Sequence, residues 1–151
     1  MSVKGLSKGS PDVAEPHESA KQAAERMQQR AIGSLVVIND HQVPIGIVTD
    51  RDLVERVLAA GKDPCLTSVA DVMTPNPIFI KEDRDIADAL KLMRQGEFRR
   101  LPIVNQEGSV CGMITLDDII LAWAEQFEAV SKVISDEMPA TIAQPRDSRW
   151  E

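Results

Sequence analysis

Hydrophobic and polar residues follow two patterns along this chain, one typical of helices and one typical of strands. The helical pattern begins after Ser19, where apolar residues recur at i, i+3, i+4 and i+7, and it returns after Asp85. Gln22, three residues beyond Ser19, completes a capping-box signature. Two short apolar, β-rich runs follow each helix, separated by polar segments typical of hairpin turns. These runs are 35–38 with 45–48, and 101–104 with 111–114.

The second set of elements repeats the first after a constant shift. Gly112 and Thr115 lie 66 positions after Gly46 and Thr49, and the segment 2–58 aligns with its copy without a gap. Self-similarity of this kind indicates an internal duplication. Extended pieces ahead of the first helix of each copy, at 12–14 and 77–80, and a second helix beginning at each threonine complete the pattern. We therefore predict an α+β fold of two tandem β-α-β-β-α copies.

The duplication divides the chain into segments. We expect the copies at 2–60 and 68–134, a linker at 61–67, and a short helical lead-in at 68–73. The tail from 137 to 151 has two prolines and no periodicity, so we expect it to be disordered.

The last predicted helix is unusually long. From Thr115 it runs to about Ile134 without glycine or proline, and one face carries an apolar stripe formed by Trp123, Phe127, Val130 and Ile134. This stripe has two interpretations. Either the helix packs on its own domain, or the stripe is an interface with a second subunit, where exposed aromatic side chains would be covered.

Composition narrows the class of protein. The chain has 151 residues, of which 43% are hydrophobic and 27% charged, as in an ordinary globular protein. Only 3% are aromatic, so the core must be built from smaller side chains, and the chain needs tight helix–sheet packing or a partner subunit to bury enough surface. The 17 basic residues against 24 acidic ones give a net charge of −7, which disfavours nucleic-acid binding.

Location and metal content follow from a few absences in the sequence. No apolar run reaches the length of a membrane span, and the first residues lack a secretion signal, so we expect a cytoplasmic protein without membrane contact. Cys65 and Cys111 lack the spacing of a metal motif, and with two histidines they are too few for a convincing zinc site.

The chemically informative motif is Gly-x-x-Thr-x-x-Asp, which occurs at 46–52 and again at 112–118. Each copy lies where a strand becomes a helix, so threonine and aspartate would form a helix cap that needs no ligand. The same geometry suits a nucleotide. A helix N-terminus and a hydroxyl attract phosphate, and a carboxylate accepts hydrogen bonds from ribose hydroxyls.

Arg99 and Arg100 are a second indication. They immediately precede the strand at 101–104, where two guanidinium groups are placed to bind phosphate in an otherwise acidic chain. A solvated surface pair is the plain alternative. The first copy has Gly33 and Ser34 at these positions, so we expect the two sites to differ in charge.

Taken together, the tandem copies, the GIVTDRDL and GMITLDDI junctions, the DVMTPNP segment and the RRLPIV strand resemble a cystathionine-β-synthase (CBS) domain pair, or Bateman module. The resemblance covers about residues 2–134. The first copy is similar to small standalone CBS-pair proteins of bacteria, which are themselves similar to the regulatory module of inosine monophosphate dehydrogenases.

This resemblance implies a disc of two copies with pseudo-two-fold symmetry and two clefts for adenosine-containing ligands such as AMP, ADP, ATP, NAD or S-adenosylmethionine. It implies that Thr49 with Asp52 contact phosphate and ribose in one cleft, and Thr115 with Asp118 in the other. The segments that enclose adenine, together with the adjoining basic positions, correspond here to Asp12, Ile32, Gly33 and Ser34 in the first copy and to Thr74, Pro77, Ile78, Phe98, Arg99 and Arg100 in the second. The N-terminal segment departs from the family pattern seen at Met73 and Thr74.

Three classes of function remain. The leading hypothesis is a non-catalytic nucleotide sensor whose conformation is read by an unknown protein effector. We expect it to be a homodimer, because Trp123 and Phe127 on the last helix favour burial against a second subunit. Catalysis by the paired aspartates at 50 and 52 or at 117 and 118 is disfavoured, because acidic residues are common in a first helical turn. The alternative is a ligand-free dimeric interaction scaffold, in which the motif is only a cap.

Overall fold

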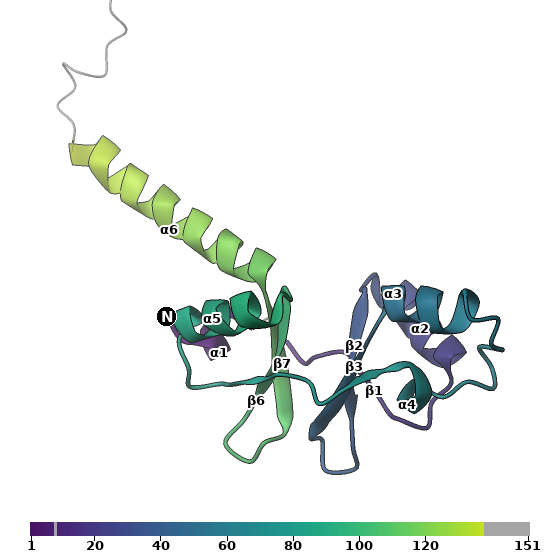
Figure 1. Ribbon diagram of the computed structural model, residues 1–151. Helices are drawn as coiled ribbons and strands as arrows, with labels where there is room; N and C mark the ends of the chain where they lie inside the picture. Colours follow the sequence, from purple (N-terminus) through teal and green to yellow (C-terminus); the bar gives the residue numbers. More distant parts are fainter. Residues whose placement is uncertain (8, 138–151) are drawn as a thin grey trace, which may run out of the picture.

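The computed structural model describes residues 1–7 and 9–137, which form two sheets (Figure 1). In each sheet a parallel first strand borders an antiparallel hairpin, as predicted. The extended piece expected at 77–80 forms a strand only from Ile80, because the residues before it face a cavity instead. The first sheet has the order β1 (Val13–Ala14), β2 (Ser34–Ile38), β3 (Pro44–Thr49), β4 (Thr74–Pro75), and the second has β5 (Ile80–Lys81), β6 (Arg100–Val104), β7 (Val110–Thr115).

Helices cover the sheets, and most begin where the sequence predicts, but the helix at Val3–Leu6 was not predicted. The Ser19 hydroxyl accepts a hydrogen bond from the Gln22 amide at 3.1 Å, and the Gln22 side chain accepts one from the Ser19 amide at 2.9 Å, which confirms the capping box. Asp85 occupies the equivalent cap without a side-chain hydrogen bond. The helices are α1 (Val3–Leu6), α2 (Ala20–Arg30), α3 (Asp50–Leu53) with a π-helical turn η1 (Val54–Leu58), α4 (Val69–Val72), α5 (Ile86–Gly96) and α6 (Leu116–Glu137).

The duplication is visible element by element. The bounds of α1, α2, β2 and β3 recur in α4, α5, β6 and β7 after the same shift of 66 residues. Even the irregularity in the hairpin pairing recurs, between Val37 and Ile38 and between Ile103 and Val104. A shared backbone irregularity shows that the copies have the same fold as well as similar sequences.

Each sheet, with the helices that cover it, forms one half of the molecule. The short helices α1 and α4 are exchanged between these two halves. Val3 is fully buried in the core of the second sheet, and Val69 is fully buried in the core of the first. Their amides donate to the carbonyl groups of Arg84 and Glu18, each at 2.8 Å. This exchange is reciprocal, so the halves are related by an approximate two-fold axis. The cores therefore do not follow the repeat boundaries of the sequence.

Two equivalent glycines allow the segments that follow α4 and α1 to lie directly against the hairpins. The Met73 side chain fills the space where a Cβ atom on Gly46 would lie, and the Ser7 hydroxyl does the same at Gly112. Any larger residue at either position would push the neighbouring segment off the hairpin. The glycines of the Gly-x-x-Thr-x-x-Asp motif thus have a structural role of their own.

Helix α6 leaves the body of the molecule (Figure 1). It continues past the predicted end to Glu137, and its buried residues are Ile119 and Ala122. Trp123 is 42% exposed and Phe127 75%, so the stripe does not pack against the described residues of its own domain, and that interpretation is wrong.

None of the helices described is apolar and long enough to span a membrane. The tail expected to be disordered lies, beyond Glu137, outside the described residues.

The hairpin turns offer a stability test. Gln42 has a left-handed φ of 63°, and its counterpart Gly108 has a φ of 84° with open space around it. Because left-handed backbone disfavours side chains, Gln42→Gly should stabilise the protein by about 0.5–1 kcal/mol and Gly108→Gln should destabilise it by about 1 kcal/mol. Urea unfolding measures both changes. A shift of the same sign in the two variants would contradict the prediction.

A partly buried ion pair should make the first half sensitive to acid. The Arg26 guanidinium lies 2.6 Å from a Glu18 carboxylate oxygen and also donates to the Val13 carbonyl. This hydrogen bond lowers the pKa of Glu18, so its stabilisation is complete above the unfolded pKa of about 4.3 and is lost as the pH falls through the lower folded value.

Glu18→Gln is therefore expected to lower the free energy of unfolding by about 1–2 kcal/mol at pH 7. The difference from the natural protein should become progressively smaller below pH ~4. Urea unfolding across this pH range measures the difference. Glu25→Gln is the control, because Glu25 forms an exposed pair with Lys21. An equal loss in the two variants would rule out a special role for Glu18.

Candidate functional site

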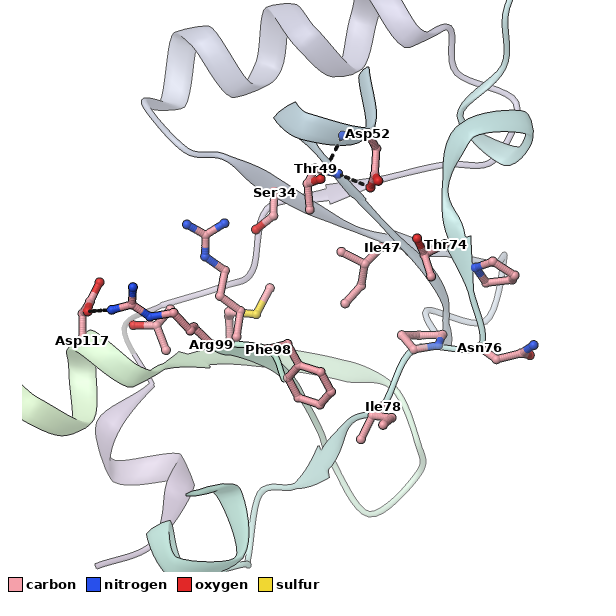
Figure 2. Close-up of a pocket in the computed structure, with 15 residues that line it drawn as sticks. Ser34, Ile47, Thr49, Asp52, Thr74, Asn76, Ile78, Phe98, Arg99 and Asp117 are labelled. Atoms are coloured by element: carbon pink, nitrogen blue, oxygen red, sulfur yellow. Dashed lines mark hydrogen bonds and ion pairs between the residues drawn. The ribbon is translucent and has the colours of Figure 1, made fainter. Parts of the chain in front are cut away.

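A cavity of about 600 Å³ lies between the two halves, and we name it the large cavity. Figure 2 shows the labelled side chains of Thr49, Thr74 and Phe98 around one open space, contributed by strands of both sheets and the segments beside them. The lining residues are Ser34, Ile47, Thr49, Asp52, Thr74, Pro75, Asn76, Pro77, Ile78, Phe98, Arg99, Arg100, Met113, Thr115 and Asp117.

A second cavity of about 310 Å³, the small cavity, lies beside it. Its lining residues are Ser10, Pro11, Asp12, Ala31, Ile32, Gly33, Ser34, Arg100, Met113, Thr115 and Asp118. Each residue of the 14 proposed from the sequence lines one cavity or both.

The cavities combine residues across the repeats. Thr49 and Asp52 share the large cavity with the 74–78 segment of the second copy, and Asp118 shares the small cavity with Asp12 of the first. The sequence grouped the candidate residues by copy. The structure regroups them because β4 of the second copy pairs with β3 in the first sheet, and because the two halves face each other. The cleft with Thr49 therefore also contains both arginines.

The two Thr–Asp pairs form the predicted caps. The Asp52 carboxylate accepts a hydrogen bond from the Thr49 amide at 2.9 Å, and the Thr49 hydroxyl accepts one from the Asp52 amide at 3.1 Å (Figure 2). Thr115 and Asp118 repeat these distances. A carboxylate offers about four acceptor sites. The cap uses only some of them, so capping and binding of hydroxyl groups are compatible.

Arg56 is a site residue that the sequence analysis missed. Its guanidinium lies 3.4 Å from an Asp52 oxygen, donates to the Val72 carbonyl at 2.7 Å, and lies 3.2 Å from the Thr74 hydroxyl. It thus fixes the cap relative to the loop of the other copy. The signal in the sequence was its i,i+4 spacing from Asp52, and the second copy has Ala122 at this position.

The side chains of Arg99 and Arg100 differ in the contacts that they form. Arg99 pairs with Asp117 at 3.2 Å, and both side chains are more than two-thirds exposed, so a ligand could displace this ion pair at little cost (Figure 2). Arg100 forms no hydrogen bond or ion pair within the described part of the chain. It lines both cavities, and a Cβ atom on Gly33 would lie 3.5 Å from its guanidinium.

Apolar side chains complete the large cavity opposite the arginines. Ile47 and Met113 were not predicted, although each lies two residues before the motif threonine, on the same face of its strand. Phe98 and Ile78 face the same space in Figure 2. The Phe98 ring lies where a Cβ atom on Gly96 would be, so this glycine makes room for it.

The carboxylates of the site have different hydrogen-bond and ion-pair partners. Asp50 accepts from the Arg51 amide, whereas Asp52 is turned to the Thr49 cap. Asp117 pairs with Arg99. Among residues 1–7 and 9–137, no three histidine, cysteine or acidic side chains are grouped to hold a metal ion.

Comparison with known proteins identifies the family. The model of the CBS domain matches this chain twice, at residues 3–59 and 69–125. The chain belongs to the CBS domain family. The matched ranges coincide closely with the duplication, so the protein contains a tandem CBS pair.

Relatives and solved structures of CBS proteins agree with this assignment. An uncharacterised protein of Methanopyrus kandleri is 41% identical over 105 residues, which are 70% of this chain and 54% of that protein, so the chain spans about half of its length. A CBS-domain containing protein of Agrobacterium tumefaciens is 29% identical with a TM-score of 0.70, covering 81% of this chain and 98% of that one. The CBS domain pair of protein MJ0100, solved with 5-methylthioadenosine and S-adenosylmethionine, is 25% identical with a TM-score of 0.72, covering 82% and 99%.

Proposed function

We propose that this CBS pair is a non-catalytic regulatory module that binds an adenosine-containing ligand in the large cavity. The observation that carries the proposal is the composition of this cavity. It has an apolar slot at Ile47, Ile78 and Phe98, a carboxylate at Asp52, and cationic groups at Arg99 and Arg100. A base binds in an apolar slot, the hydroxyls of a ribose donate to a carboxylate, and a phosphate pairs with arginine.

The related MJ0100 pair supports adenosine as the common part of the ligand, because both of its bound molecules contain it. The two arginines favour a ligand with phosphate groups, such as AMP, ADP, ATP or NAD, over a cationic one. Binding joins segments of both copies, so it would bias their relative arrangement, and an effector protein would read this change.

Calorimetry on nucleotide-free protein tests the proposal. Adenosine, AMP, ATP, NAD and S-adenosylmethionine are titrated, with guanosine and GTP as controls for the base. Failure of every adenosine compound to bind would refute the proposal and leave the interaction scaffold as the better description of the protein.

The matched variants Asp52→Ala and Asp118→Ala locate the site. Each removes the same cap, at a similar cost of about 1 kcal/mol in stability, but from different cavities. Asp52→Ala should weaken adenosine binding about tenfold or more, because a charge-assisted hydrogen bond is lost, and Asp118→Ala should leave the first binding event unchanged. The reverse order would place the main site in the small cavity.

A further inference from the structure

The exposed apolar face of α6 has a regular spacing. Its residues follow one another at intervals of three, four, three and four positions, and all are at least 42% exposed. We name this row the α6 seam. It consists of Ile120, Trp123, Phe127, Val130 and Ile134.

This spacing averages 3.5 residues, which is the period of a coiled coil. The buried residues of α2 and α5 also follow one another at intervals of three and four positions, so what distinguishes the seam from these core-covering faces is its exposure. The seam begins after Ile119, the last large buried residue of α6, so the part of the helix that carries it is separate from the domain core.

The distribution of charge indicates what covers the seam. Between Ile120 and Ile134 the charged residues are Glu125, Glu128 and Lys132, and at this period all of them lie on the outer side of the helix. The positions that flank the seam are neutral, and they are Ala124, Gln126, Ser131 and Val133. Two identical seams therefore meet without like charges opposite each other, and a strongly charged partner would find no counter-charge along the seam.

The rest of the described chain does not cover this face. Figure 1 shows α6 pointing away from both sheets, and its residues from Trp123 to Glu137 are all exposed. A two-fold pair of identical helices buries the same row of side chains from both partners. We propose that the α6 seam is the interface with a second copy of this chain, formed as a two-stranded coiled coil of the two α6 helices.

Sedimentation velocity with two matched variants tests the pairing. Phe127→Glu and Ala129→Glu each add one glutamate to an exposed position of α6, but only the first lies in the seam. The natural protein and Ala129→Glu should sediment as dimers, and Phe127→Glu as a 16.6 kDa monomer. Because Phe127 is 75% exposed, the substitution should leave the body folded, which circular dichroism checks. A natural protein that is monomeric at every concentration, or a Phe127→Glu dimer, would overturn the proposal.

Tryptophan fluorescence tests whether the α6 seam is covered by a second copy of the chain or by another segment. In a Trp150→Phe background, Trp123 is the remaining tryptophan, and its emission should shift to the red on dilution as the dimer dissociates. A blue emission that is independent of concentration in a monomer would mean that the chain's own C-terminal segment covers the seam, and it would refute the pairing. Neither measurement depends on nucleotide, so this inference and the proposed function can fail separately.

Discussion

Replacing Arg100 with serine is expected to weaken the binding of AMP and ATP by roughly ten- to a hundredfold and to leave the binding of adenosine almost unchanged. The reason is the position of this residue. Arg100 lines both cavities and has no partner within the described residues, so its charge is available to a phosphate. Serine is the residue that the first copy carries at the equivalent position, Ser34, so the change makes the two copies alike.

Calorimetry with adenosine, AMP and ATP distinguishes the contribution of the phosphate groups to affinity from that of the nucleoside. Arg51→Ser is the matched control, because Arg51 pairs with Glu55 on the surface and lines neither cavity. The reciprocal change, Ser34→Arg, should strengthen ATP binding, since Ser34 also lines both cavities. If Arg100→Ser weakens adenosine as much as ATP, the residue supports the fold of the site and does not bind phosphate.

A buried charge at Val3 is expected to unfold the second half of the molecule, although Val3 belongs to the first repeat. Val3 is fully buried in the second core, and an unpaired carboxylate there should destabilise the protein by several kcal/mol. Val69→Asp is the matched variant, because Val69 is equally buried in the first core.

Native-state hydrogen exchange distinguishes the two variants. Val3→Asp should increase exchange first in β6 and β7, and Val69→Asp first in β2 and β3. If hydrogen exchange rises first in the sheet of the same repeat, the placement of α1 in the second half and of α4 in the first is wrong. Where the variants do not fold, Val3→Ala and Val69→Ala give the same comparison with a smaller loss of buried surface.

Local patterns predicted most of the secondary structure, because the determinants lie close together in the sequence. The cap at Ser19 with Gln22 needs only four consecutive residues, and the hairpins need an apolar run on each side of a polar turn. The duplication then transferred each prediction to the second copy. The fold class followed from these elements together with the resemblance to the CBS pair.

Contacts between distant residues were not predictable in the same way. Nothing near Val3 indicates that it packs 80 or more positions away, although its recurrence as Val69 was a signal. The candidate site residues were named individually, but their grouping depends on which faces of the two sheets meet. Arg56 was missed because its contacts require the Thr74 hydroxyl of the other repeat, which β4 brings into the first sheet. The exposed fractions of α6 were needed to reject the interpretation that the Trp123 stripe packs on its own domain.

The exchange of α1 and α4 has a consequence for synthesis on the ribosome. Proteins emerge N-terminus first, and independent domains fold in that order. Here every residue of the first core lies between Ala14 and Met73, so this core is complete when about half of the chain has emerged. The second core needs Val3 together with Ile119, so the earliest segment to emerge must wait for one of the latest. The first half can therefore fold early, but only after α4 of the second repeat has been made, while α1 stays exposed until the start of α6 has left the ribosome.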